Sequence, residues 1–102
     1  MITTIAEAER EGQFDGGKRA ITRFLTTPQD LDYFASSSDT RVAMSLDLLA
    51  LGRRVAQERQ ADFGKRESRA KVERMEAYAK GFKHGALQEI WKAVEMLKLE
   101  VQ

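Results

Sequence analysis

The sequence predicts an all-α fold in which short N-terminal helices pack on a long C-terminal helical hairpin. Helical patterning covers residues 39–102, nearly two thirds of the 102-residue chain, with no proline and only single glycines inside it. Charged residues make up 32% of the chain, compared with about 25% in an average soluble domain. At this length a single domain, residues 1–102, is expected, with a limited core and long helices that can complete their burial by oligomerising.

A first short helix is expected to begin after Thr4. The segment Thr4-Ile-Ala-Glu7 fits a capping box, in which the hydroxyl and the carboxylate each satisfy a free backbone N–H. This helix is expected to stop near Gly12. Residues 15–17 (Asp-Gly-Gly) are then typical of a turn, because two adjacent glycines make a helix costly.

Two further short helices complete the expected N-terminal part, residues 1–38. Residues 18–26 place four apolar side chains on one helical face: Ala20, Ile21, Phe24 and Leu25. Pro28 suits the first position of the next helix, residues 28–35, because the backbone N–H that it lacks has no partner there.

Residues 39–102 predict two antiparallel arms, residues 40–62 and 66–101. Asp39 is expected to cap the first arm, and Phe63-Gly64 marks the bend between the two. An unbroken second arm is about 50 Å long at about 1.5 Å per residue, which exceeds what the first arm can cover. The excess must pack on the N-terminal helices or on a second chain.

A stripe of small residues lies on the second arm at four-residue spacing: Ala77, Gly81 and Gly85. Missing side chains allow another helix backbone to come close. Glycine also has a low helix propensity, so the same residues allow a break or a kink between Gly81 and Gly85. The sequence leaves both interpretations open.

The leading functional hypothesis is a non-catalytic protein–protein interaction module that forms a homo-oligomer through its C-terminal helix. The strongest apolar stripe near the C-terminus, with two small residues at a close crossing, is the predicted oligomer interface: Ala77, Gly81, Leu87, Ile90, Trp91, Val94 and Leu97. Such a module acts as an adaptor, an assembly factor or an inhibitor of a larger target. A third hypothesis, a small phage or mobile-element protein that blocks a host machine, is compatible with the acidic first 39 residues.

The second hypothesis is a nucleic-acid-associated protein, for instance a subunit of a nucleoprotein complex. Residues 53–74 carry eight basic side chains against four acidic ones, and basic side chains bind phosphates by displacing condensed counterions. The residues expected to contact phosphates are Lys65, Arg66, Arg69 and Lys71. The alternative is a solvated helical face with ion pairs, because acidic residues are interleaved with the basic ones.

Several other functions are disfavoured. The chain has no cysteine and a single histidine, His84, and it lacks metal-ligand spacing. No residues fit the geometry of an active site, so we expect neither enzymatic activity nor a cofactor. A helix-turn-helix over residues 18–36 would present Asp30 and Asp32 to DNA without a basic side chain, which disfavours it. Without signal-peptide features or an apolar run long enough for a membrane span, the chain is expected to be cytoplasmic.

Overall fold

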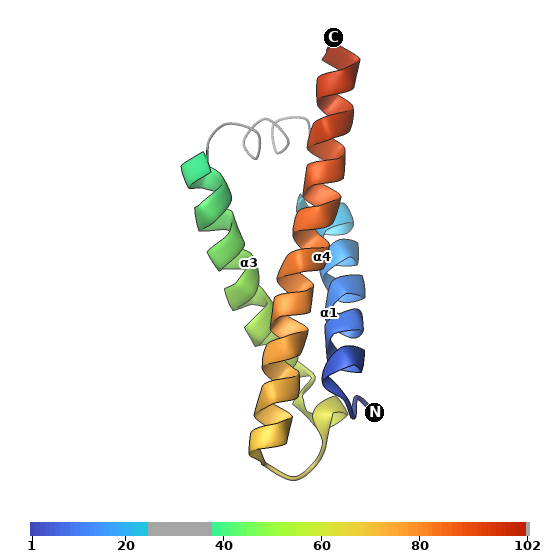
Figure 1. The fold of residues 1–102 in the computed structure, drawn as a ribbon, viewed down its shortest axis with the longest axis vertical. Helices are drawn as coiled ribbons and strands as arrows, with labels where there is room; N and C mark the ends of the chain where they lie inside the picture. Colours follow the sequence, from blue (N-terminus) through green and yellow to red (C-terminus); the bar gives the residue numbers. More distant parts are fainter. Residues whose placement is uncertain (25–37, 102) are drawn as a thin grey trace.

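The computed structural model describes residues 1–24 and 38–101, and within them every regular element is a helix (Figure 1). The elements in chain order are α1 (Ile5–Arg19), a π-helical turn η1 (Ala20–Phe24), α3 (Ser38–Glu58), a 3₁₀ turn η2 (Gln60–Phe63) and α4 (Arg69–Val101). The prediction of an all-α fold with a long C-terminal helix is therefore confirmed. The predicted helix over residues 28–35 lies outside the described residues, as does the end of the one over residues 18–26.

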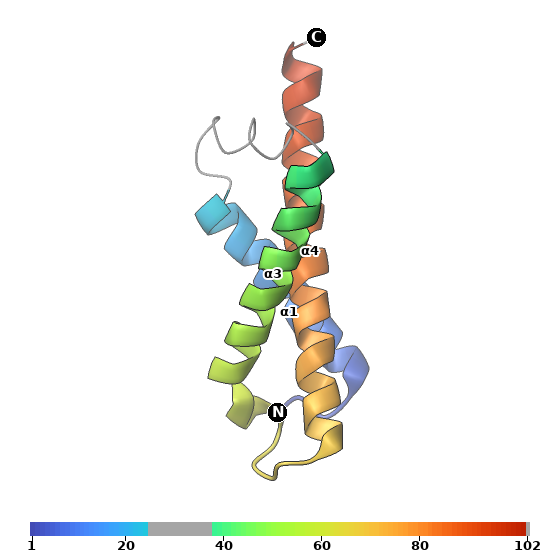
Figure 2. The ribbon, with the colours of Figure 1, turned by 90° about the vertical axis from the view of Figure 1, so that its left-hand side faces the viewer.

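The two longest contacts in the fold are made by α4 (Figures 1 and 2). Helix α1 runs beside α4 in the same direction and crosses it obliquely, whereas α3 runs in the opposite direction. Helix α3 is closest to α4 near its own C-terminal end and diverges from it toward its N-terminal end (Figure 1). The result is an elongated molecule, 53 × 22 × 18 Å.

Helix α1 begins as the sequence predicts but ends later. Thr4 caps it, because the Thr4 hydroxyl oxygen accepts a hydrogen bond of 3.1 Å from the backbone N–H of Glu7. The helix then continues through Gly12 to Arg19. The predicted end near Gly12, the turn at residues 15–17 and the separate helix start at residue 18 are therefore wrong.

Packing against α4 explains why glycines persist inside α1. A Cβ atom added at Gly12 would overlap the backbone carbonyl oxygen of Tyr78, and one added at Gly16 would overlap that of Phe82. Any other residue type would force the two backbones apart. The glycines cost α1 about 1 kcal/mol each in helix propensity, but they permit a backbone-to-backbone contact that no larger residue allows.

The glycines of α4 face α1 in the same way. A Cβ atom at Gly81 would overlap the backbone carbonyl oxygen of Glu9, and one at Gly85 would overlap that of Gln13. Of the two interpretations of this stripe, the close crossing is the one observed, and it lies within a single chain. Helix α4 continues through both glycines without a break.

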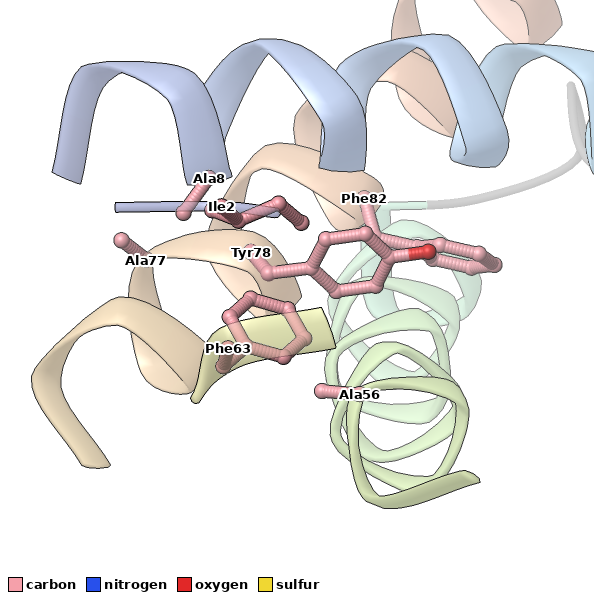
Figure 3. Close-up of a cluster of buried hydrophobic side chains, with 7 residues drawn as sticks. All are labelled: Ile2, Ala8, Ala56, Phe63, Ala77, Tyr78 and Phe82. Carbon is pink, nitrogen blue, oxygen red and sulfur yellow. The ribbon is translucent and has the colours of Figure 1, made fainter. Parts of the chain in front are cut away.

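The aromatic part of the interior lies where α1, α3, η2 and α4 meet (Figure 3). Phe63, Tyr78 and Phe82 are almost completely buried. The rings of Phe63 and Tyr78 pack edge to face with centroids 5.6 Å apart, a favourable arrangement for aromatic pairs. A second cluster lies further along α4 and consists of Ala20, Leu48, Ala86, Ile90 and Val94.

The hairpin has its bend at the predicted place with slightly different arm ends. Gly64 has φ = 121°, a backbone conformation that strongly favours glycine, and η2 precedes it. Helix α3 ends at Glu58, so the first arm is shorter than the predicted residues 40–62. Asp39 lies inside α3, whose first residue is Ser38.

The adjacent residues Gly16 and Gly17 provide a matched test of the α1–α4 contact. We expect Gly16→Ala to lower the free energy of unfolding by about 1–3 kcal/mol or more, because the new Cβ displaces the Phe82 backbone. Gly17→Ala should instead be neutral or stabilising by up to about 1 kcal/mol, because its Cβ would lie 3.4 Å from the flexible Glu89 side chain. Urea unfolding followed by circular dichroism measures both values, and equal effects of the two substitutions would contradict the described packing.

Candidate functional site

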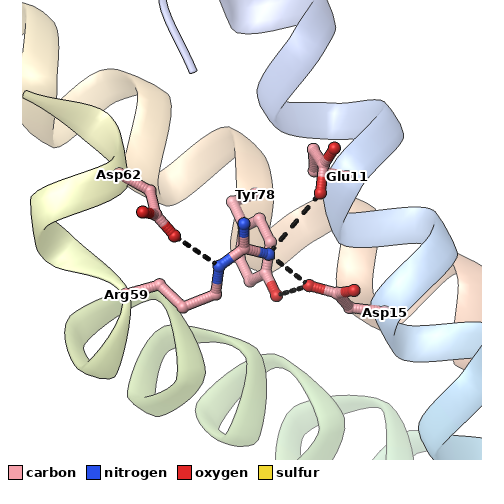
Figure 4. A network of polar contacts seen from close by, with 5 residues as sticks. All are labelled: Glu11, Asp15, Arg59, Asp62 and Tyr78. Carbon is pink, nitrogen blue, oxygen red and sulfur yellow. Dashed lines mark hydrogen bonds and ion pairs between the residues drawn. The ribbon is translucent and has the colours of Figure 1, made fainter. Parts of the chain in front are cut away.

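A network of polar side chains joins α1, the α3–α4 turn and α4 (Figure 4). At its centre Arg59 directs Nη1 toward Asp15 Oδ2 at 2.6 Å and toward Glu11 Oε2 at 3.5 Å. Its Nε donates a hydrogen bond of 2.9 Å to Asp62 Oδ2. The guanidinium carbon lies 5.5 Å from the centroid of the Tyr78 ring, within range for a cation–π interaction. One cation therefore links three carboxylates and a core aromatic ring.

Tyr78 connects this network to the aromatic interior. Its hydroxyl donates a hydrogen bond to Asp15 Oδ2. Burial and this bond to an anion raise the pKa of the Tyr78 phenol, and the nearby Arg59 charge only partly opposes them. Burial acts to lower the pKa of Arg59, but its hydrogen bonds to Asp62 and Tyr78 and the Asp15 charge outweigh burial and raise it. Tyr78 therefore stays neutral and Arg59 stays charged around pH 7.

The chemistry of this network is that of a structural brace. Asp15 is engaged by both Tyr78 and Arg59, and Asp62 is engaged by Arg59. The N-terminus is fastened to the same region, because the backbone N–H of Ile2 donates a 2.8 Å hydrogen bond to the carbonyl oxygen of Asp62. The contacts hold α1 against the turn that follows α3.

The predicted phosphate-contacting residues separate into two environments. Lys65, Arg66 and Arg69 are exposed around the turn that precedes α4. Lys71 is not available to a phosphate in this fold: it is 2% exposed, and its Nζ lies 2.8 Å from Glu67 Oε1. Burial of a lysine head group requires such a partner, and the Glu67–Lys71 spacing places the carboxylate one turn away.

Other basic side chains of residues 53–74 are engaged within the chain. Arg53 forms an ion pair with Glu76 at 2.7 Å, and Arg74 donates a 2.7 Å hydrogen bond to the Phe63 carbonyl oxygen. The hydrogen bonds from Arg53 lower the pKa of Glu76. Much of the excess positive charge of this segment is therefore part of the internal packing.

The predicted oligomer interface also separates into two groups. Ala77, Gly81, Ile90 and Val94 are buried inside the chain, the first two against α1 and the last two in the second apolar cluster. In this fold these four are not surface residues, because α1 and α3 already cover them. Leu87 and Trp91 are half-buried at the margin of that cluster. The side chain of Leu97 lies outside the described residues.

A surface that the sequence analysis missed lies on the outward side of α1. Phe14 is 70% exposed and Ile21 is 55% exposed. Between them lies an apolar hollow with a volume of about 370 Å³, which Gly17 and Glu89 also line. The predicted turn at residues 15–17 separated Phe14 from Ile21. A continuous helix places them two turns apart on one face.

No protein-family model matches this chain, and neither the curated proteins nor the solved structures provide a match. Among the described residues, no cluster of three or more acidic or histidine side chains is arranged to hold a metal ion. The helices described here also lack the combination of length and apolar character needed to cross a membrane.

Tyr78→Phe tests the polar network through its pH dependence. Removing the hydroxyl should lower the free energy of unfolding at pH 7 by about 1 kcal/mol, through loss of the hydrogen bond to Asp15. Because the folded protein raises the pKa of Tyr78, this residue's contribution is complete below the unfolded value of about 10 and is lost as the pH rises further. Unfolding curves measured from about pH 7 to about pH 11 should therefore fall more steeply for the wild type than for Tyr78→Phe. Parallel curves would show that the phenol proton is not held as described.

Proposed function

We propose that this chain is a non-catalytic helical interaction module that self-associates and serves as an adaptor, an assembly factor or an inhibitor of a larger protein. The observation that carries this proposal is the pair of large apolar side chains, Phe14 and Ile21, on the outward face of α1. Single exposed apolar residues are ordinary on protein surfaces, but a cluster beside an apolar hollow is typical of an interaction site.

The internal packing supports this assignment to the outer surface. Gly12 and Gly16 commit the inward face of α1 to α4, and Ile90 and Val94 are already covered. An interaction through the well-packed interior would require the helices to separate. Binding through the outward face of α1 leaves the fold unchanged, as in most preorganised complexes.

Light scattering coupled to size exclusion, at low and high salt, tests the proposal. An apolar interface predicts an oligomer whose mass is the same at both salt concentrations, because screening weakens mainly exposed charge pairs. The absorbance ratio at 260 and 280 nm serves as the control for bound nucleic acid. A clean monomer at high micromolar concentration would refute self-association.

Nucleic-acid association is the second candidate, and the exposed group Lys65, Arg66 and Arg69 favours it. The three side chains lie close together in sequence around the start of α4, so one stretch of phosphates could contact them all. Binding would be largely independent of nucleotide sequence and would weaken steeply as salt rises.

The triple replacement of Lys65, Arg66 and Arg69 by glutamine tests this alternative. If all three contact duplex phosphates, the slope of log K against log salt should become less negative by roughly 2.7. Arg10→Gln, at an exposed base on α1, serves as the matched control. Fluorescence anisotropy with a labelled duplex measures the slopes, and an unchanged slope in the triple variant would reject phosphate binding by these residues.

A further inference from the structure

The outward face of α1 carries a protrusion and a hollow beside each other. Phe14 projects with 70% of its surface exposed. Three residues later, Gly17 contributes no side chain to the apolar hollow of about 370 Å³, which is bounded further by Ile21 and Glu89. Residues three and seven apart share one helical face. We call this hollow the Gly17 notch.

Gly17 differs from the other glycines of the helical crossing in having no steric partner that requires it. Cβ atoms at Gly12 and Gly16 would overlap the α4 backbone, whereas one at Gly17 would meet the end of the Glu89 side chain at 3.4 Å. A mid-helix glycine weakens a helix by about 1 kcal/mol relative to alanine. The interior of the chain therefore explains Gly12 and Gly16 and leaves Gly17 to be explained from outside.

A protrusion and a hollow on one face are complementary to the same face of a second molecule. A two-fold axis perpendicular to α1, passing between residues 15 and 16, makes the two helices antiparallel. Phe14 of each copy then lies opposite Gly17 of the other. In the same register Ile21 lies opposite Arg10 of the partner copy, whose aliphatic stem can cover it.

We propose that the outward face of α1 is a self-complementary docking surface for a second copy of this chain, with Phe14 of each copy seated in the Gly17 notch of the other. This inference rests on the self-association in the proposed function and identifies the surface that performs it. Shape alone would also admit another apolar partner, and the charges around the notch favour a second copy.

Charged groups at the rim of the notch match in this antiparallel arrangement. Lys18 and Gln13 line the notch together with Glu89. The two-fold axis places Lys18 of one copy opposite Gln13 of the other, on the side of the notch where Glu89 lies. Each dimer would therefore form two such Lys18–Glu89 approaches at its rim. Rim charges of this kind fix register more than they add affinity.

Two substitutions test the proposal by opposite means. Phe14→Glu removes the protrusion, and Gly17→Leu fills the notch while leaving the α1–α4 contact untouched. Each should weaken the dimer by about thirtyfold or more, the effect expected at the centre of an interface. Val72→Glu is the matched control, because Val72 is a 60% exposed apolar residue on α4, and it should leave the dimer unchanged. Sedimentation equilibrium gives the dissociation constants, and circular dichroism verifies that each variant keeps its helices.

Reversal of the rim charges tests the register. Lys18→Glu and Glu89→Lys should each weaken the dimer by about threefold to tenfold, because both rim contacts change at once. The double variant should regain wild-type affinity. Additive losses in the double variant would rule out the antiparallel register.

The outcomes separate this inference from the function on which it rests. An oligomeric wild type whose mass is unaffected by Phe14→Glu and Gly17→Leu overturns the α1 surface and leaves self-association standing. A monomeric wild type at high micromolar concentration overturns both. A dimer lost in both variants and retained in Val72→Glu supports the proposed surface.

Discussion

Four glycines bring the backbones of α1 and α4 into direct contact, and the remainder of the structure depends on that approach. Gly12 and Gly16 on one helix and Gly81 and Gly85 on the other each face a carbonyl group of the opposite helix. The hydrogen that replaces a Cβ at these positions points toward a carbonyl oxygen, an arrangement that recurs at close helix–helix interfaces. A helix with four larger residues there would have to pack further from its neighbour.

The polar brace around Arg59 follows from this approach. With α1 close to α4, Asp15 reaches both the Tyr78 hydroxyl on α4 and Arg59 at the end of α3. The three side chains come from three separate elements, so their contacts fix the rotation of α1 as well as its distance. The rotation determines that Phe14 faces outward, and the proposed docking surface is therefore a consequence of the internal packing.

Local signals in the sequence were sufficient for the parts of the fold that depend on neighbouring residues. The cap at Thr4 and the bend at Gly64 are of this kind, because each is set by hydrogen bonding or backbone conformation within a few residues. The glycines at positions 16 and 17 could not be interpreted locally, because their low helix propensity is offset by a contact with residues more than 60 positions away. Once that segment was predicted to be a turn, the shared face of Phe14 and Ile21 was hidden.

The candidate sites show the same division. Charge counting correctly located a basic segment, but the burial of Lys71 beside Glu67 and the pairing of Arg53 with Glu76 depend on tertiary structure. The apolar stripe of α4 was recognised from its spacing. Spacing alone cannot distinguish a stripe covered by the same chain from one covered by a second copy, and Ile90 and Val94 are covered by the same chain.

Nuclear Overhauser effects between α-protons of α1 and α4 test the central claim most directly. A Cβ placed on Gly16 would lie 2.9 Å from the Cα of Phe82, one on Gly81 3.0 Å from that of Glu9, and one on Gly85 2.7 Å from that of Gln13. The α-protons of each pair must therefore be close enough for strong cross-peaks, which are rare between helices whose backbones are separated by side chains. Three such cross-peaks in the folded protein are the predicted result. Helical chemical shifts through residues 5–19 without any of these cross-peaks would contradict the close crossing.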